Sequence, residues 1–146
     1  MTLPTNDIIP NLQKEATLQS YGVNAFAILI NENDTTLTIN SPVADIIAKE
    51  LPDASGYARE LISVDTISVS GAGDVVTAAY TSASWSFTAD VTFTHVVLLN
   101  GAISTIADTT GQAWWIHPVN GGNPLTRGSG DSPYEHTLTN LNYDLL

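Results

Sequence analysis

Residues 91–99, which read VTFTHVVLL, constrain the fold more than any other part of the sequence. β-Branched and aromatic side chains fit the pleated surface of a sheet, and alternate residues of a strand share one face. The residues on one predicted face are Val91, Phe93, His95, Val97 and Leu99. The dipeptide that follows, Asn100-Gly101, favours the positive φ angles of a tight hairpin turn. The sequence therefore predicts a central β-strand that ends in a tight hairpin.

Short strand-forming segments separated by turn residues make up most of the remaining chain. The predicted strands cover residues 23–30, 37–39, 57–64 continuing into 67–69, 75–80, 84–87, 103–107, 112–119 and 136–143. One helix is predicted over residues 43–50, with Ser41 as its N-cap and Pro42 at its first position. This pattern is typical of a mainly β protein, and we expect an antiparallel β-sandwich, jelly-roll-like, with one short helix.

The chain divides into an N-terminal arm, residues 1–20, and a single domain, residues 21–146. A length of 146 residues fits one domain. The arm is polar, and its apolar side chains Leu12 and Leu18 are too widely spaced to form the apolar stripe of an amphipathic helix, so we expect an extended arm with one helical turn. Two interpretations of the arm remain open: it packs on a neighbouring subunit, or it frays as chain termini often do.

The charge balance excludes some classes of partner. The net charge is −11, with only four Lys and Arg residues. Proteins that bind nucleic acid or anionic membranes neutralise phosphates with these residues, so we expect neither partner. The sequence has no apolar run long enough to span a bilayer, and its first residues lack the pattern of a signal peptide. We therefore expect a soluble protein that is made in the cytoplasm.

Two short motifs resemble parts of known sites, but their contexts differ. Gly71-Ala72-Gly73 follows a predicted strand, yet no helix is predicted after it to hold a pyrophosphate. Gly130-Asp131-Ser132 is similar to a serine nucleophile loop, yet no histidine motif accompanies it. Cysteine is absent, which excludes a thiolate nucleophile and a disulfide framework. We expect no enzymatic activity and no cofactor.

Metal sites are also disfavoured by the spacing of the possible ligands. The three histidines, His95, His117 and His136, lie far apart without the short spacing of a metal motif. Residues 31–34 offer amide and carboxylate oxygens but lack the glycine and the distal glutamate of an EF-hand loop. The sequence therefore predicts no metal ion.

Four residues of the predicted domain are candidates for contacts with other subunits, together with Ile8, Ile9 and Leu12 of the arm. Arg59 is a scarce cation on a predicted strand, and a salt bridge to a nearby carboxylate is its simplest role. His95 is expected in the core or in an interface. Trp114 and Trp115 are adjacent in a predicted strand, so they should point to opposite faces. Core packing, a subunit interface and stacking on a glycan all remain open for them.

Four segments, in order along the chain, carry a resemblance to a known family. They are Asn6-Asp7-Ile8-Ile9-Pro10-Asn11, Gly56-Tyr57-Ala58-Arg59, Ala83-Ser84-Trp85 and Phe93-Thr94-His95-Val96. In this order and spacing they are similar to a family of small virion proteins of tailed bacteriophages. The likeness covers most of residues 6–101 and does not extend to the tryptophan pair or to the glycine-rich residues 120–133.

The resemblance implies a phage structural protein built as a β-sandwich, and accessory virion proteins commonly form symmetric oligomers. We expect a capsid cement or decoration protein, a homotrimer whose partner is the major capsid protein and whose location is the virion. A tail-fibre, neck or baseplate component is the alternative within virions. A carbohydrate-binding module that uses Trp114 or Trp115 with residues 120–133 is the alternative outside them.

Overall fold

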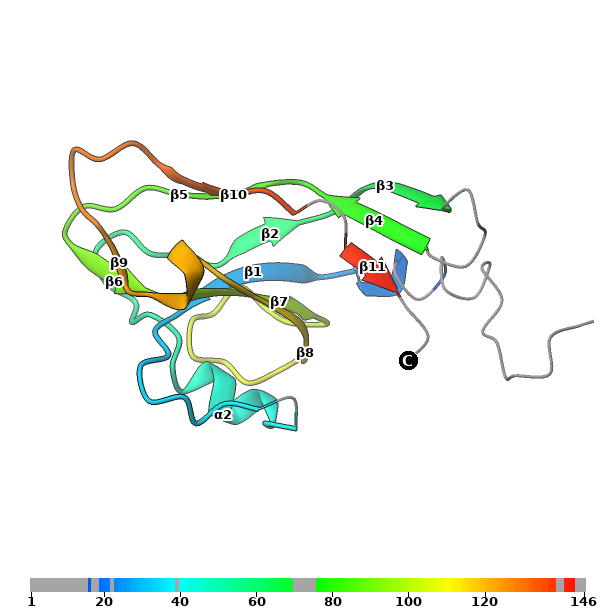
Figure 1. The fold of residues 1–146 in the computed structure, drawn as a ribbon, viewed down its shortest axis with the longest axis horizontal. Coiled ribbons are helices and arrows are strands. Elements are labelled where there is room, and N and C mark those ends of the chain that lie inside the picture. Colours follow the sequence, from blue (N-terminus) through cyan, green and yellow to red (C-terminus); the bar gives the residue numbers. More distant parts are fainter. Residues whose placement is uncertain are drawn as a thin grey trace, which may run out of the picture.

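The computed structural model describes residues 16, 19–21, 23–38, 40–69, 76–138 and 141–143, and antiparallel β-structure dominates them. The strands are β1 (Ala25–Ile30), β2 (Glu60–Ile62), β3 (Val64–Val69), β4 (Val76–Tyr80), β5 (Ala83–Trp85), β6 (Val91–Phe93), β7 (His95–Asn100), β8 (Gln112–Pro118), β9 (Leu125–Arg127), β10 (Tyr134–His136) and β11 (Leu141–Tyr143) (Figure 1). The helix α2 (Val43–Ile47) and the 3-10 turn η1 (Asn120–Gly122) follow in the domain, and residues 16 and 19–21 are also helical. The prediction of a mainly β protein with a short helix is confirmed. No helix among the described residues is long and apolar enough to cross a membrane.

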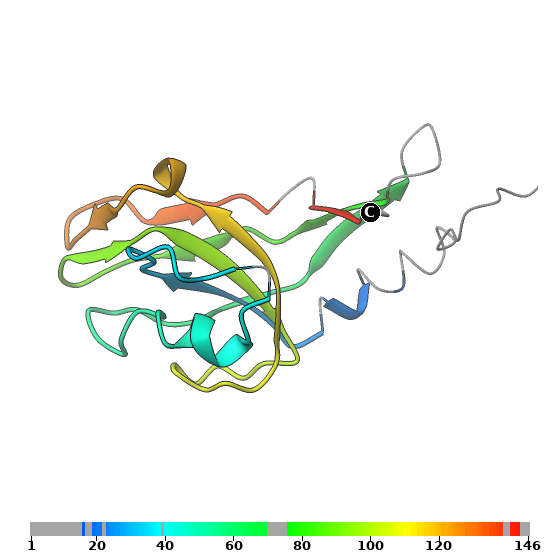
Figure 2. The same ribbon diagram turned by 60° about the horizontal axis from the view of Figure 1, so that its bottom comes forward.

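The strands form a four-stranded sheet and three smaller ones. The large sheet has the order β2-β1-β7-β8, and the small sheets pair β10 with β5, β11 with β4 and β3, and β6 with β9. Every pairing is antiparallel. Strands β5 and β10 lie over one face of the large sheet, and α2 lies against the other face (Figures 1 and 2).

Both faces of the large sheet are covered, which explains why every residue of β1 is buried. One face of β1, with Ala27 and Leu29, belongs to a core that also contains Tyr80, Trp85 and Phe93. We call this cluster the main core. The opposite face of β1 and β7 meets Ile46 and Ile47 of α2 in a second cluster, the helix-side core. A strand buried on both faces needs a continuous apolar sequence, and AFAILI provides one.

The predicted strand over residues 91–99 is interrupted at Thr94, which corrects the predicted face. β6 ends at Phe93 and pairs with β9, whereas β7 begins at His95 and pairs with β1 and β8. Phe93 lies in the main core, but Val97 and Leu99 lie in the helix-side core. The alternation of side chains is therefore reversed at Thr94, and Phe93 does not share a face with Val97 and Leu99.

Hydrogen bonds to the buried Thr94 explain the interruption. Its N–H donates to Ile30 O at 2.9 Å, and its carbonyl accepts from Val119 N–H at 2.9 Å. Its Oγ1 accepts from Glu32 N–H at 2.8 Å. Thr94 thus satisfies the main-chain groups where β1 and β8 end, and the chain passes from one sheet to another at this residue.

The connection between β7 and β8 is a long loop, and the predicted tight hairpin at Asn100-Gly101 is wrong. Gly101 has a positive φ of 61°, as expected, but the chain continues to Gly111 before β8 begins. Gly101 N–H and Ala102 N–H donate to Val23 O and Asn24 O, so this loop is attached to the start of β1. The predicted strand over residues 103–107 is absent because these residues form turns in this loop.

The helix prediction is confirmed in type but not in its boundaries. α2 covers Val43–Ile47, and Pro42 occupies the N-cap position without a side-chain cap. Ser41 is not the N-cap, because its Oγ accepts a hydrogen bond from Thr38 N–H at 2.7 Å on the upstream side. Residues 37 and 38 form no strand, and Ile39 lies outside the described residues. The buried Ile46 and Ile47 face the sheet as the sequence predicts.

The predicted loop over residues 120–133 contains regular structure. η1 and β9 lie within it, and β9 pairs with β6, with Leu125 opposite Phe93 and Arg127 opposite Val91. The predicted last strand, residues 136–143, is divided into β10 and β11, which pair with different partners. Within the N-terminal arm only residues 16, 19 and 20 are described, and they are helical.

Candidate functional site at the edge of strand β8

Strand β8 lies at one edge of the large sheet. It pairs with β7 on one side, and no described strand pairs with it on the other. Val119 N–H donates to Thr94 O. The alternation of an antiparallel ladder then directs the main-chain groups of Ile116 away from β7, toward the free edge. Pro118 is directed the same way but has no N–H. The main-chain N–H and C=O groups that can bond to an added strand therefore lie mainly at Ile116.

A β-bulge in β8 brings both tryptophans to the same face of the sheet. Leu98 is opposite Trp115 and Leu99 is opposite Ala113, so Trp114 is the extra residue. Both indoles pack against the main core. The prediction that Trp114 and Trp115 point to opposite faces is therefore wrong, because a bulge reverses the alternation of side chains by one residue.

Each indole has an aromatic partner within the chain. Trp114 stacks on Tyr21, with ring centroids 4.8 Å apart and an interplanar angle of 21°, and it also contacts Tyr80. Trp115 stacks on His117, with centroids 5.0 Å apart and an interplanar angle of 1°. The Trp114 Nε1 atom is buried and has no hydrogen-bond partner among the described residues. Both tryptophans are partly buried, so their main contacts are with their own chain.

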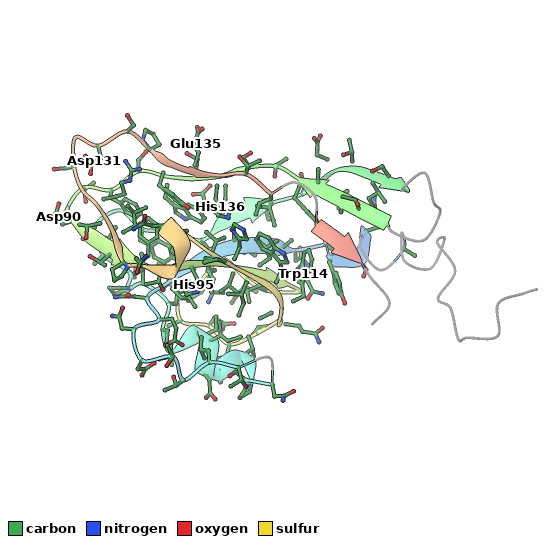
Figure 3. The ribbon with its side chains drawn as sticks, in the orientation of Figure 1. Asp90, His95, Trp114, Asp131, Glu135 and His136 are labelled. Atoms are coloured by element: carbon green, nitrogen blue, oxygen red, sulfur yellow. The ribbon has the colours of Figure 1, made fainter. Side chains whose placement is uncertain are left out.

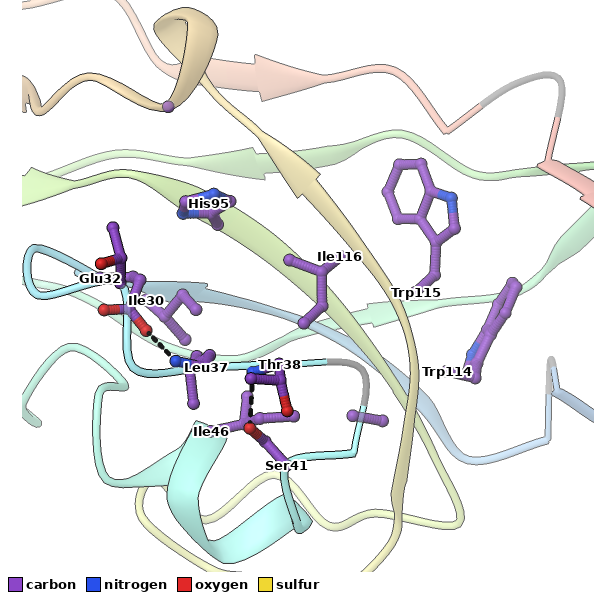
Figure 4. Close-up of a pocket in the computed structure, with 13 residues that line it drawn as sticks. Ile30, Glu32, Leu37, Thr38, Ser41, Ile46, His95, Trp114, Trp115 and Ile116 are labelled. Atoms are coloured by element: carbon purple, nitrogen blue, oxygen red, sulfur yellow. Dashed lines mark hydrogen bonds between the residues drawn. The ribbon is translucent and has the colours of Figure 1, made fainter.

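A groove with a volume of about 750 Å³ lies beside β8, and Trp114, Trp115 and Ile116 are among the residues that line it. Its apolar wall includes Leu37 and Ile46 from the segment around α2, with Ile116 from β8, and its polar rim includes Glu32 and His95. Ile116 projects toward Leu37 and Ile46, whereas Trp114 and Trp115 project to the opposite side of the β8 ribbon (Figure 4). Ile116 is 41% exposed, which is unusual for an isoleucine in the middle of a strand.

The acidic rim of this groove is paired within the chain. Glu32 Oε2 accepts from Leu37 N–H at 3.2 Å, which shapes the loop beside β8. Lys49 Nζ lies 3.4 Å from Glu32 Oε1 and 2.7 Å from Asp34 Oδ1. Residues 31–34, a possible calcium loop by sequence, therefore have the ammonium group of Lys49 beside their carboxylates. The described residues contain no group of three or more histidine and acidic side chains arranged to hold a metal ion.

Two histidines that lie far apart in the sequence meet beside β8. His117 Nδ1 and His136 Nε2 are 3.1 Å apart, and Tyr134 Oη lies 2.8 Å from His136 Nδ1. His95 is separate, with its Nδ1 2.8 Å from Thr94 Oγ1. Burial lowers the pKa of His95, while nearby Glu32 acts in the opposite direction. Figure 3 places His95, Trp114 and His136 over the interior of the molecule, whereas Asp90, Asp131 and Glu135 lie toward its rim.

The contact between His117 and His136 predicts a dependence of stability on pH. Burial and, after it, the neighbouring His117 lower the pKa of His136 from 6.5 to about 4. The unfolded chain therefore binds a proton between pH 6.5 and about 4 that the folded chain does not, so stability falls as the pH falls through this window. His117 is exposed, so solvent screens its effect on His136. We therefore expect the protonation of His136 to lower the free energy of unfolding by about 1–2 kcal/mol across this window.

Urea unfolding of the wild type and of His136→Gln at pH 7 and pH 4.5 measures this contribution. Carboxylates titrate in both proteins, so the difference between the proteins isolates the histidine. We expect the loss of unfolding free energy on acidification to be smaller in His136→Gln. An equal loss in both proteins would contradict the assignment.

Arg59 lies in the interior, where it joins three segments. Its Nε and Nη2 donate to Glu50 Oε1 and Oε2 at 2.8 and 2.7 Å, and the two side chains are 0% and 1% exposed. Its Nη1 donates to Ile103 O and its Nη2 to Asp108 O, within the loop between β7 and β8. The predicted salt bridge to a nearby carboxylate is confirmed. Because the Arg59 side chain is fully buried within its own chain, the structure does not support a role for Arg59 in a subunit interface.

The structure brings together some of the predicted contact residues and omits others. His95, Trp114 and Trp115 all line the groove beside β8. Ile8, Ile9 and Leu12 lie outside the described residues. Ile116 was not predicted, although it lies two residues before Pro118 in a predicted strand, and proline within a sheet is found mainly in edge strands. That proline was the signal that β8 is an edge strand.

Comparisons with known proteins add no relative to this description. No family model, no curated protein sequence and no solved structure matches the chain.

Proposed function

We propose that the chain is a non-enzymatic structural protein of a tailed-bacteriophage virion, and that it acts as a cement or decoration protein that stabilises the head through subunit contacts. The observation that carries the proposal is the free edge of β8, where the partly exposed Ile116 lies beside an apolar groove. The resemblance of four ordered segments to small phage virion proteins supports the same assignment.

A sheet edge without charged side chains suits a protein that works by assembly. Natural proteins usually cover such edges or place charges on them, since an edge pairs readily with another chain. β8 has no Lys, Arg, Asp or Glu, and its outward main-chain groups lie next to an apolar groove. An added strand would gain main-chain hydrogen bonds from the edge and side-chain contacts from the groove. β8 is therefore the proposed assembly contact.

The finer architecture belongs to the same proposal. β5 and β10 lie over one face of the large sheet, with the main core between the two layers. This arrangement supports a β-sandwich, jelly-roll-like, that carries the N-terminal arm. The proposed assembly is a homotrimer on the major capsid protein. A tail-fibre, neck or baseplate location would use the same contact.

A carbohydrate-binding module has less support. Such modules need an aromatic ring face that is free to stack on a sugar. Trp114 stacks on Tyr21, and Trp115 stacks on His117. Stacking on a glycan would have to displace these contacts or use only the second face of each ring.

Substitutions on the two edges of the large sheet test the proposed function. Ile116→Asp places a charge beside the groove of β8, and Leu61→Asp places the same charge on β2, the opposite edge, where Leu61 is 68% exposed. Burying an unpaired charge in an assembly contact costs more than 1.4 kcal/mol, so Ile116→Asp should weaken binding at least about tenfold. Leu61→Asp should leave binding near that of the wild type.

Sedimentation with expanded empty capsids, built from the major capsid protein of the same genome, measures this binding. Thermal unfolding of both variants establishes that each remains folded. Wild-type protein that stays in the supernatant at every concentration would contradict the cement function. Equal binding by the wild type and a folded Ile116→Asp variant would contradict the role of β8.

A further inference from the structure

We propose that the strand added to β8 is a segment of the N-terminal arm, residues 3–12, from a neighbouring copy of the same chain. The inference rests on the proposed function only in taking β8 as the assembly contact. It names the occupant of that edge, so the capsid is contacted by an oligomer whose subunits exchange their arms.

The side chains of the arm match the two faces of β8. Adjacent residues of a strand point to opposite faces, so Ile8 and Ile9 would point to different sides of an added strand. One isoleucine would enter the groove beside Ile116, and the other would lie on the face that carries Trp115 and His117. Two consecutive apolar residues therefore suit an edge that has Ile116 on one face and the Trp115 ring on the other.

The charge and the prolines of the arm also fit this edge. Between Thr2 and Gln13 the only charged side chain is Asp7, so little charge would be buried next to the apolar wall of the groove. Pro10 lacks an N–H and so limits the added strand on one side of the two isoleucines. Pro118 limits the available edge of β8 in the same way. Both partners therefore offer a short pairing segment, and both segments are bounded by proline.

The point where the arm leaves the domain favours a neighbouring copy. The Trp114 ring, on which Tyr21 stacks, lies on the main-core face of β8, whereas Ile116 and the apolar wall of the groove lie on the opposite side of the strand (Figure 4). The helical residues 19–21 lie at one end of the molecule, away from α2 and the loop that forms the groove (Figure 2). To fill its own groove, the arm would have to cross the sheet edge and run back along β8. The arm of a neighbouring copy could reach the groove without crossing this edge.

The arm is long enough to reach a second subunit. About 15 extended residues span roughly 50 Å, which exceeds the width of a domain of this size, about 35 Å. Each copy would supply one arm and offer one edge, so the contact is head-to-tail. A head-to-tail contact closes into a ring when its rotation permits, and a closed ring accounts for the proposed trimer.

Engineered disulfides test the occupant directly, because the natural chain has no cysteine. Ile8→Cys and Ile9→Cys proteins are each mixed with Ile116→Cys protein under mild oxidation, and the products are separated by mass. We expect a covalent dimer from Ile116→Cys with one of the two arm variants and much less with the other, because only one arm residue faces the groove. Leu61→Cys on the opposite edge is the matched control and should give no dimer above background.

The outcomes separate the inference from the proposed function. Absence of the dimer would overturn the inference, as would equal yields with Ile116→Cys and Leu61→Cys. A cross-link that forms only within one molecule, in a double variant at high dilution, would also overturn it, because the arm would then cover its own edge. If the mixed dimer forms but the oligomer does not sediment with capsids, the arm exchange stands and the cement function fails. If capsids bind the protein without arm cross-linking, the reverse holds.

Discussion

Replacing Arg59 with Met should lower the free energy of unfolding by about 3–5 kcal/mol, because removal of one partner of a buried ion pair leaves the other charge uncompensated. The carboxylate of Glu50 is 1% exposed and receives two hydrogen bonds from Arg59. Tyr57 O–H and Ala107 N–H also donate to it, at 3.0 and 2.9 Å, but neither supplies a positive charge. A loss of this size is a large part of the 5–15 kcal/mol that typically stabilises a domain.

The same network anchors the loop between β7 and β8, so the effect of Arg59→Met extends to the proposed assembly edge. Arg59 donates to Ile103 O and Asp108 O in that loop. Burial, and the nearby carboxylate of Glu50 after it, raise the pKa of Tyr57, which remains a neutral donor throughout the usual pH range. We expect the loop to lose protection from amide hydrogen exchange in the variant.

Urea unfolding with linear extrapolation measures the loss, with two controls. Asp34→Asn removes the exposed partner of Lys49, whose contact with Glu32 remains, and should lower the free energy of unfolding much less than Arg59→Met does. The double variant Arg59→Met with Glu50→Gln removes both charges and should recover part of the loss. A loss below 1 kcal/mol in Arg59→Met would show that the buried charge is compensated in another way.

Phe93→Ala is the second large effect that we expect, with a loss of about 3–5 kcal/mol in unfolding free energy. The Phe93 ring is 0% exposed. It contacts Tyr134 and Phe87, with centroid distances of 5.0 and 6.0 Å. Truncation would remove these contacts and leave a cavity at the point where β6 meets the main core. Because β6 pairs with β9, the segment over residues 120–133 should become less ordered as well.

Thermal and urea unfolding of Phe93→Ala and Phe93→Leu separate the cavity from a general disturbance of the strand. Phe93→Leu keeps most of the apolar volume and should cost about 1–1.5 kcal/mol. Leu61→Ala, at an exposed position on β2, should change stability by less than about 0.5 kcal/mol. If Phe93→Ala and Phe93→Leu were equally stable, Phe93 would not occupy the core position described.

The sequence predicts the β-rich class and most strand positions because local apolar patterns are strong in β1, β7 and β8. It fails at Thr94 and Trp114, where a single residue reverses the alternation. Thr94 ends β6 because it bonds to Ile30 and Val119, and Trp114 is a bulge because of its pairing with β7. Both irregularities depend on partners distant in the chain, which local periodicity does not contain. The predicted β-sandwich and the virion assignment remain predictions.

The candidate site was predictable in part. His95, Trp114 and Trp115 were predicted as contact residues from their positions in the sequence, and all three line the groove. Ile116 was missed because an isoleucine in a strand is normally a core residue, and only the order of the sheet makes it an edge residue. The contact between His117 and His136 was missed because β8 and β10 belong to different sheets.

The solution mass of the purified 146-residue chain, measured by light scattering, tests the central claim most directly. Assembly through β8 and the arm predicts three times the chain mass of 15.5 kDa, and it predicts the mass of a monomer for Ile116→Asp and for a variant that lacks residues 1–15. A wild-type protein that remains a monomer at every concentration would contradict the proposed assembly.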